Sequence, residues 1–425
     1  MHMWFDAGMQ SMPRGFYSLL TAQFFSSWAD NALLIVAIAH LVLQGESGWM
    51  IPLLKFGFTL AYVLLAPWVG AGADGWDKSR IMWWSHALKL TGVIGMASDL
   101  NPIWAYALVG VGAALYSPAK YGWMTQMVPP AQLVKANGWI EASTVCAAIL
   151  GVACGGWWIS PAFGQSLSAI WPLDIEMDLI WAYVAVCCCY LCTVVLTAEL
   201  PKAPMQDIPG QKWLARPIQF IKVDWLTLWR DAPARVSLCI TTLFWGIGAC
   251  MQLLVLEWAQ DDLGLSLGQG AYLQGLSGVG VMAGAWWAGR YLTLQGHRKV
   301  LVCGALLGAL LPLMLWIDHW ILAIPLTLIM GGLGGLLVVP MNAMLQHRGV
   351  QVLTAGRSVA VQNFNENLSI LLMLALYAGI IHVLGSWIYI LIFFATSMFL
   401  LSLGLAWMTE TAPTAPDPSA IDRRT

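Results

Sequence analysis

Charged residues are scarce in this chain: Asp, Glu, Lys and Arg together make up 10% of its 425 residues. Soluble globular domains carry about 25% charged residues. The net charge is only −2, and no basic stretch is arranged to follow a phosphate backbone. The composition therefore excludes an ordinary soluble enzyme, and we expect no nucleic-acid partner.

The motifs that would supply catalysis or ATP-driven energy are also missing. There is no Gly-x4-Gly-Lys-Ser/Thr loop to bind the phosphates of ATP. The nine cysteines lack the spacing of a metal site, and the seven histidines are scattered along the chain. A membrane enzyme such as an acyltransferase, the alternative from another class, would need a nucleophile and a base that the sequence does not offer. We therefore expect no enzyme activity, no metal and no cofactor.

Long apolar runs are what the chain does contain, and 59% of its residues are hydrophobic. A helix needs about 20 apolar residues to cross a bilayer, and the 25 tryptophans suit the boundary between membrane and water. The sequence predicts an all-α membrane protein with twelve transmembrane helices. The predicted spans are 14–43, 49–72, 80–98, 102–125, 132–158, 178–199, 235–258, 269–293, 297–316, 319–346, 354–384 and 386–408.

The distribution of Lys and Arg orients these spans. One set of connections holds basic residues, among them Lys78, Arg80, Lys135 and those of the segment 200–234. Because positive residues collect on the cytoplasmic side of a membrane, the pattern predicts that both termini are cytoplasmic. The other set of connections contains no Lys or Arg: 44–48, 99–101, 159–177, 259–268, 317–318 and 385.

The segment 200–234 divides the spans into six and six. It begins with three prolines and continues with Trp, Leu, Ile and basic residues, which predicts an amphipathic helix on the cytoplasmic surface. We therefore expect an N-terminal six-helix half at 14–199, a cytoplasmic linker at 200–234 and a C-terminal six-helix half at 235–408. The polar, Pro-rich tail at 409–425 is predicted to be disordered.

A weak internal repeat relates the two halves. Pro118 and Lys135 are 17 residues apart, as are Pro340 and Arg357, and the two pairs are offset by 222 residues. The connection GAGADGWDKSR at 70–80 corresponds in position to GRYLTLQGHRK at 289–299. Repeated halves of this kind are typical of membrane transporters.

The first of these connections resembles the loop signature of the major facilitator superfamily. Six further strings are distinctive: AQFFSSWADNALL (22–34), LVGVGAALYSPAKYG (108–122), LVKANGWIEAST (133–144), LFWGIGA (243–249), GGLGGLLVVPMNAMLQHRG (331–349) and AVQNFNENLSILLML (360–374). Through them, much of the chain resembles the bacterial lysophospholipid transporters of the inner membrane, which belong to that superfamily. The resemblance implies two six-helix halves that rock around a central cavity. It also implies that the loop residues Gly70, Asp74, Lys78 and Arg80, together with Glu141 and Arg357, take part in gating.

Two acidic residues lie deep in predicted spans. Asp30, about 24 Å into the first span at 1.5 Å per residue, has Asn31 beside it, and Glu366 shares one helical face with Gln362 and Asn363. Ionisable groups inside a membrane are costly and face a cavity or a partner. We expect all five to bind substrate, although a structural ion pair between helices is an alternative for Asp30.

Four basic or acidic residues remain open to more than one interpretation. Lys120 follows Pro118 within the fourth span and either binds a phosphate or extends its side chain to the cytoplasmic surface. Lys89 favours a structural ion pair, and Glu141 either pairs with Lys89 or Lys120 or contacts a ligand. Arg235, near the start of the seventh span, is a second candidate for the phosphate.

The resemblance also implies a substrate. The related transporters carry lysophospholipids, chiefly lysophosphatidylethanolamine, from the outer to the inner leaflet, where an acyltransferase/acyl-carrier-protein synthetase restores the missing chain. For this chain it implies Lys120 and Arg235 as phosphate ligands, Asp30 and Glu366 as ammonium ligands, and a monomer among membrane lipids of the bacterial inner membrane. A proton-coupled drug or small-solute transporter of the same superfamily is the alternative, and the sequence leaves energy coupling open.

Overall fold

The computed structural model describes residues 12–47, 50–160, 162–163, 166, 179–205, 213–294 and 299–411. These residues form helices and connections, with no β-strand among them, so the predicted all-α fold is confirmed. Twelve helical segments of the described residues coincide with the twelve predicted spans. They are α1 (Phe16–Leu43), α2 (Ile51–Gly75), α3 (Lys78–Ala97), α4 (Pro102–Met127), α5 (Leu133–Trp158), α7 (Ile180–Ala198), α10 (Ala232–Asp261), α11 (Leu267–Tyr291), α12 (Leu301–Leu310) with η8 (Leu311–Trp316), α13 (Trp320–Val352), α14 (Ala355–Leu384) and α15 (Ile388–Thr411).

Eight of the described helices are long and apolar enough, by length and composition, to cross a membrane: α1, α2, α5, α7, α10, α13, α14 and α15. Helices α3, α4 and α11 have 20, 26 and 25 residues, which is sufficient by length. The ninth predicted span is the shorter apolar segment of α12 and η8. It changes from an α-helix to a 3-10 helix at Leu311, next to Pro312, because proline has no N–H to donate to an α-helical hydrogen bond.

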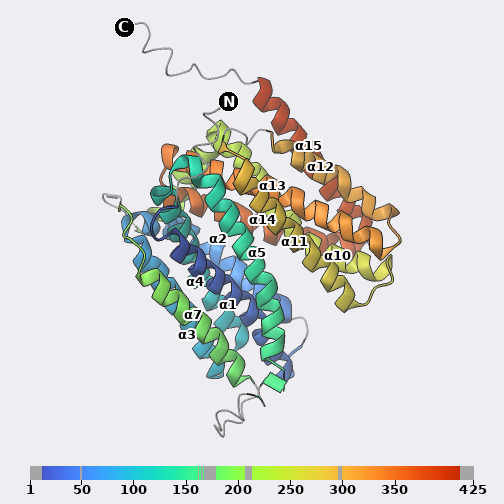
Figure 1. The fold of residues 1–425 in the computed structure, drawn as a ribbon, viewed down its shortest axis with the longest axis horizontal. Helices are drawn as coiled ribbons and strands as arrows, with labels where there is room; N and C mark the ends of the chain where they lie inside the picture. The colour runs from blue at the N-terminus through green and yellow to red at the C-terminus, as the bar shows by residue number, and fades with distance from the viewer. Residues whose placement is uncertain are drawn as a thin grey trace.

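The helices pack into two bundles, which we call the N-terminal half and the C-terminal half. In Figure 1 the first is drawn in blue to green and the second in yellow to red. Within the N-terminal half, α1 packs on α5 and α7, and α3 packs on α4 and α7; within the C-terminal half, α11 packs on α13 and α12 packs on α15. The halves meet where α2 packs on α14 and α5 packs on α11.

Polar side chains fix where several helices begin. Asp77 accepts a hydrogen bond from the backbone N–H of Ser79 and caps α3, and Asn101 caps α4 in the same way. Asp231 caps α10, which therefore begins at Ala232, three residues before the predicted span. By contrast, the prolines of the internal repeat do not interrupt their helices: α4 continues through Pro118 and α13 through Pro340.

The linker between the halves is more irregular than the single amphipathic helix that the sequence predicts. It consists of η5 (Trp213–Ala215), α8 (Arg216–Gln219), the π-helical turn η6 (Phe220–Trp225) and α9 (Leu226–Arg230). Helix α15 continues three residues beyond the predicted limit at 408, and the rest of the predicted disordered tail lies outside the described residues. We call the end of the molecule that carries the linker and the α2–α3 connection the linker end.

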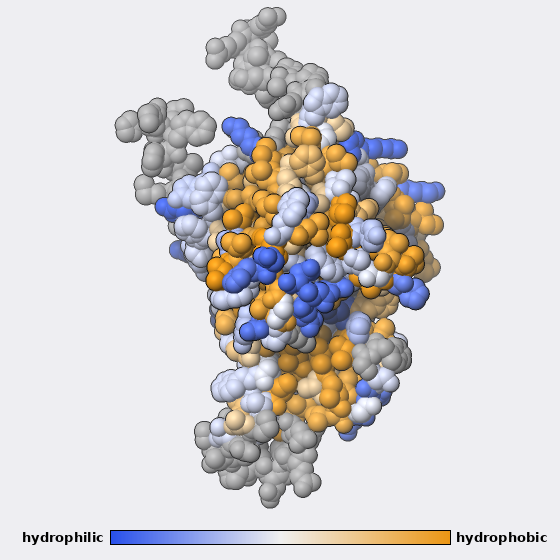
Figure 2. All heavy atoms as spheres, turned by 90° about the vertical axis from the view of Figure 1, so that its right-hand side faces the viewer, coloured by the Kyte–Doolittle hydropathy of each residue, from blue (hydrophilic) through white to orange (hydrophobic). Residues whose placement is uncertain are grey.

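Large apolar side chains cover much of the surface. Leu64, Ile94, Leu191, Leu372 and Leu400 are all exposed, although each belongs to a helix of one of the two halves. Figure 2 shows hydrophobic side chains over broad areas of one face, with hydrophilic side chains gathered in separate groups. A soluble protein does not expose apolar areas of this extent, so the helices are surrounded by lipid.

Candidate functional site

In the N-terminal half, Asp30 and Lys89 form an ion pair in which the lysine is buried and the carboxylate is partly buried. Lys89 Nζ lies 2.9 and 2.7 Å from the two carboxylate oxygens of Asp30 and also donates to Ser26 Oγ at 3.0 Å. The hydroxyl of Tyr190 donates to Asp30 Oδ1 at 2.5 Å. Lys89 is only 1% exposed, so each charge compensates the other where water is excluded. The ion-pair interpretation of Lys89 agrees with this geometry, and the Asp30 carboxylate is already engaged by α3 and α7.

Lys120 has different surroundings, because its one hydrogen-bond acceptor is neutral. Its Nζ donates to Gln23 Oε1 at 3.0 Å and lies 4.0 Å from the ring centroid of Tyr121 and 5.4 Å from that of Tyr116. The residue is 5% exposed, so its side chain stays in the interior, and the surface-seeking alternative is wrong. Among the described residues, no carboxylate oxygen lies within 4.0 Å of Lys120.

Gln23 fixes the position of this lysine. Its amide nitrogen donates to Ser27 Oγ at 2.8 Å and to Thr144 Oγ1 at 2.9 Å, which leaves its carbonyl oxygen directed to Lys120. Glu141, one turn before Thr144 on α5, is buried and interacts electrostatically with Lys120, but within the described part of the chain it forms no ion pair. Neither of its two predicted ion pairs is present. Asn31 donates to the backbone oxygen of Ser27 at 2.8 Å.

In the C-terminal half, the predicted polar face of α14 is buried and hydrogen-bonded. Gln362 Nε2 donates to Asn342 Oδ1 and to Glu366 Oε1, both at 2.8 Å. Asn363 Nδ2 crosses to the other half and donates to Ser117 Oγ at 2.9 Å, one residue before Pro118. Glu366 itself is buried, and no Lys, Arg or His of the described residues lies within ion-pair distance of it.

The structure therefore sorts the predicted intramembrane charges into two kinds. Asp30 and Lys89 neutralise each other, whereas Lys120, Glu141 and Glu366 form no ion pair within the described residues. Lys120 and Glu141 lie in the N-terminal half, and Glu366 lies in the C-terminal half. Tyr62 of α2 is within electrostatic range of both Asp30 and Glu366, and Tyr121 is within range of Glu366. A buried ionisable group without an ion-pair partner inside a membrane protein is a candidate for a functional role. Arg235 does not join them, because it lies in the first turn of α10 at the linker end.

At the linker end, Asp74 joins the two halves. Its carboxylate accepts hydrogen bonds from Thr354 Oγ1 at 2.5 Å, from the Gly356 N–H at 2.7 Å and from the Arg357 N–H at 3.0 Å. A residue of α2 thus caps the N-terminus of α14, which belongs to the other half. Gly70, one turn earlier on α2, packs against Gly356 and Ala360, where a side chain would collide with the α14 backbone. The geometry supports a gating role for both residues.

Sequence reasoning missed two further connections at this end. Asn137 of α5 and Gln346 of α13 exchange amide hydrogen bonds of 2.8 and 3.0 Å, and both side chains are buried. Asp224 of the linker is fully buried and pairs with Arg216 and with Arg357. Asn137 and Gln346 are visible in the sequence only as polar residues in apolar spans, which says nothing of their partners. Asp224 gives no such signal, because the linker around it is itself rich in polar and basic residues.

Two of the predicted gating residues act within the N-terminal half. Lys78 is buried and donates to the backbone oxygen of Pro204 at 3.3 Å, so it joins α3 to the segment after α7. Arg80 lies 3.9 Å from Asp77, and its side chain is 77% exposed. Among the described residues of the linker end, Asp74 joins α2 to Thr354, Gly356 and Arg357 of the other half, and Asn137 joins α5 to Gln346 of α13. The Arg357 side chain joins α14 to Asp224 of the linker, and these contacts close the linker end in this conformation.

Removing the Asp74 carboxylate is expected to open the linker end. Loss of a helix cap costs about 1–2 kcal/mol, which corresponds to roughly tenfold more frequent opening. In Asp74→Ala, amide hydrogen exchange should accelerate by about that factor at 354–358. Asp77→Ala is the matched control, because Asp77 caps α3 within a single half. Equal acceleration at 354–358 in both variants, or in neither, would contradict the role given to Asp74.

Comparison with known proteins identifies the superfamily to which this architecture belongs. The family model of the Major Facilitator Superfamily matches residues 19–372. A bacterial homologue of the iron transporter ferroportin, solved in an outward-facing state, superposes with a TM-score of 0.68 at 15% identity over 94% of this chain and 100% of that one. The E. coli fucose:proton symporter superposes with a TM-score of 0.69 at 13% identity over the same shares. The chain is a multi-pass membrane transporter of the major facilitator superfamily.

Relatives in sequence identify the family within this superfamily. The lysophospholipid transporter LplT of Yersinia enterocolitica is 38% identical over 373 residues, which are 87% of this chain and 88% of the relative. LplT of Salmonella arizonae is 39% identical over 368 residues, or 86% of this chain and 88% of the relative. The chain belongs to the LplT family, as the resemblance of its motifs predicts.

Proposed function

We propose that this protein carries lysophospholipids, chiefly lysophosphatidylethanolamine, from the outer to the inner leaflet of the bacterial inner membrane. The relatives are named lysophospholipid transporters. One structural observation supports the same substrate class for this chain: a buried cation, Lys120, and a buried anion, Glu366, lie on opposite halves and form no ion pair with any described residue.

The head group of lysophosphatidylethanolamine has the complementary pair of charges. Its phosphate needs a cation, and Lys120 offers one that, within the described part of the chain, donates only to the neutral Gln23. Its ammonium group needs an anion, and Glu366 offers one whose hydrogen-bond partners among the described residues, the Gln362 amide and the Thr241 hydroxyl, are both neutral. Binding the zwitterion would neutralise both residues and remove the cost of leaving them charged in the interior.

This assignment changes the roles expected from the sequence. Asp30 becomes the residue that neutralises Lys89, and it acts on the substrate through the position of α1 rather than through an ammonium contact. Arg235 is no longer assigned to the phosphate site, because it lies at the linker end. Glu366 alone contacts the ammonium group, so a head group without an amine, such as that of lysophosphatidylglycerol, would still bind through Lys120.

Transport then requires the linker end to alternate between closed and open. In the conformation described, Asp74 caps α14 and Asn137 pairs with Gln346 across the halves. We propose that the substrate enters from the opposite end, that these ties then break, and that the lipid leaves on the cytoplasmic side. With both termini cytoplasmic, the product would reach the acyltransferase/acyl-carrier-protein synthetase that restores its second chain, and a monomer suffices for this cycle.

The proposed function is tested by transport into liposomes. The purified protein is reconstituted, and inward movement of lysophosphatidylethanolamine, two-chain phosphatidylethanolamine and a cationic dye is followed with and without a proton gradient. We expect lysolipid movement well above that in empty liposomes and little movement of the two-chain lipid. Lysolipid movement equal to that in empty liposomes would refute the proposal, and gradient-driven dye movement would favour the proton-coupled alternative.

A further inference from the structure

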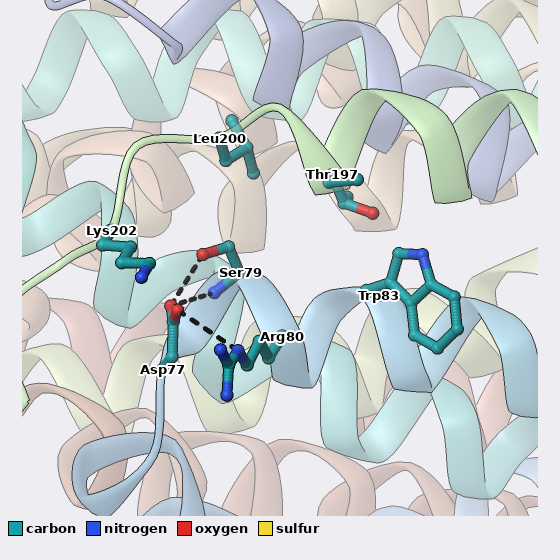
Figure 3. Close-up of a pocket in the computed structure, with 8 residues that line it drawn as sticks. Asp77, Ser79, Arg80, Trp83, Thr197, Leu200 and Lys202 are labelled. Atoms are coloured by element: carbon teal, nitrogen blue, oxygen red, sulfur yellow. Dashed lines mark hydrogen bonds and ion pairs between the residues drawn. The ribbon is translucent and has the colours of Figure 1, made fainter.

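Two adjoining hollows open at the linker end, on the outside of the N-terminal half. The first has a volume of about 230 Å³ and the second about 410 Å³, and both are lined by Asp77, Arg80 and Lys202. Figure 3 shows the amine of Lys202 and the guanidinium of Arg80 turned toward Asp77 at the end of α3, with Thr197 and Trp83 farther along the hollow. Neither hollow is lined by Lys120 or Glu366, the two residues of the proposed substrate site, which we call the central site.

The charges around the hollows do not balance. The Asp77 carboxylate already accepts hydrogen bonds from the N–H and the hydroxyl of Ser79, at 3.1 and 2.6 Å. Arg80 lies 3.9 Å from it with a largely exposed side chain, and Lys202 is exposed and takes part in no ion pair among the described residues. One carboxylate thus faces two cations, and the excess positive charge suits an anionic group.

The surroundings of these cations are apolar. Trp76, Trp84 and Met205 line the second hollow and are 62%, 66% and 63% exposed. Tryptophan gathers at the boundary between head groups and hydrocarbon. Farther from the linker end, Val195 and Leu191 are also exposed. They belong to α7, the helix that packs on α3. The charged groups therefore lie nearer the linker end than the exposed apolar side chains do. A phospholipid in that leaflet places its phosphate and its acyl chains in the same order.

We propose that this site, the α3 hollow, binds the phosphate of a two-chain membrane phospholipid from the leaflet at the linker end. Arg80 and Lys202 hold the phosphate, and the acyl chains lie along Trp84 and the outer surface of α3 and α7. The net positive charge favours an anionic lipid such as phosphatidylglycerol over zwitterionic phosphatidylcholine. The α3 hollow joins the start of α3 to the segment leading into the linker, and it does not depend on which substrate the central site carries.

The test measures lipid binding by the intact protein. Phosphatidylglycerol is titrated into the full-length protein in detergent, and bound lipid is counted by native mass spectrometry, with phosphatidylcholine titrated in parallel. In Arg80→Gln/Lys202→Gln, the Kd of the tightest phosphatidylglycerol is expected to rise about thirtyfold, since each basic residue near an anionic lipid contributes roughly fivefold. Lys222→Gln/Arg230→Gln is the matched control, because both residues are exposed on the linker and line neither hollow.

Three outcomes decide the proposal. It is overturned if the control variant weakens phosphatidylglycerol binding as much as Arg80→Gln/Lys202→Gln, or if phosphatidylcholine binds wild type with equal Kd. It is also overturned if inorganic phosphate at roughly 10 mM displaces the lipid, because the hollow would then be a soluble-anion site. Unchanged thermal unfolding of both variants in detergent alone confirms that folding is intact, and transport of lysolipid in liposomes is measured separately.

Discussion

Replacing Lys89 by methionine is expected to abolish lysolipid transport and to destabilise the protein. Lys89 is buried, and its ammonium group is the cation that neutralises Asp30. Removing one partner leaves the Asp30 carboxylate uncompensated in the interior, which costs about 3–5 kcal/mol. Asp30→Ala should have the same two effects, because it leaves Lys89 charged and buried. Thermal unfolding in detergent and lysolipid movement in liposomes measure the two effects.

The double variant Asp30→Asn/Lys89→Met separates structure from substrate binding. Both charges are gone, and the amide oxygen introduced in place of the carboxylate can still accept a hydrogen bond from Tyr190, so most of the lost stability should return. If Asp30 acts by positioning α1, part of the transport returns as well. A stable double variant without transport would instead indicate that Asp30 contacts the head group directly. Lys55→Met is the control, because Lys55 is an exposed lysine of a neighbouring span, and this variant should change neither quantity.

The sequence predicts the helices of this protein well, because apolar length is a local property. Every predicted span coincides with a described helical segment. Helix α10 begins earlier than predicted because Asp231 caps it, and Pro312 lies next to the change from α12 to the 3-10 helix η8. The consequence of Pro118 was harder to predict, since its effect depends on the neighbours of α4 rather than on the chain around it. The helix continues through it, and Ser117 beside it contacts Asn363 of the other half.

Which side chains pair with each other could not be predicted in the same way. Helical spacing shows that Gln362 and Glu366 share a face, and their hydrogen bond confirms it. It does not show that Lys89 meets Asp30, 59 residues away, or that Asn137 meets Gln346, 209 residues away, because those pairs depend on how helices pack. Asp224 illustrates the limit: within a basic, amphipathic linker it resembles a surface residue, yet Arg216 and Arg357 enclose it.

Replacing Lys120 by methionine is expected to slow transport strongly while the protein remains folded. Lys120 has no paired carboxylate, so its removal leaves no uncompensated anion within ion-pair distance and takes a charge out of the interior. A hydrogen bond to a charged phosphate contributes about 1.5–3 kcal/mol. The initial rate at low lysolipid concentration should therefore fall at least about tenfold, with unfolding unchanged or shifted to higher temperature. Unaltered transport by Lys120→Met would remove the lysine from the phosphate site.

Head-group preference distinguishes the two charges from each other. Lysophosphatidylethanolamine and lysophosphatidylglycerol both carry the phosphate, so Lys120→Met should slow both to the same extent. Only the first carries an amine, so Glu366→Gln, which keeps a partner for Gln362, should slow lysophosphatidylethanolamine selectively. Equal slowing of both lipids by Glu366→Gln would mean that Glu366 holds α14 in place instead of contacting the ammonium group. The quantity to compare is the ratio of lysophosphatidylethanolamine to lysophosphatidylglycerol transport within one variant, because this ratio does not depend on the amount of active protein.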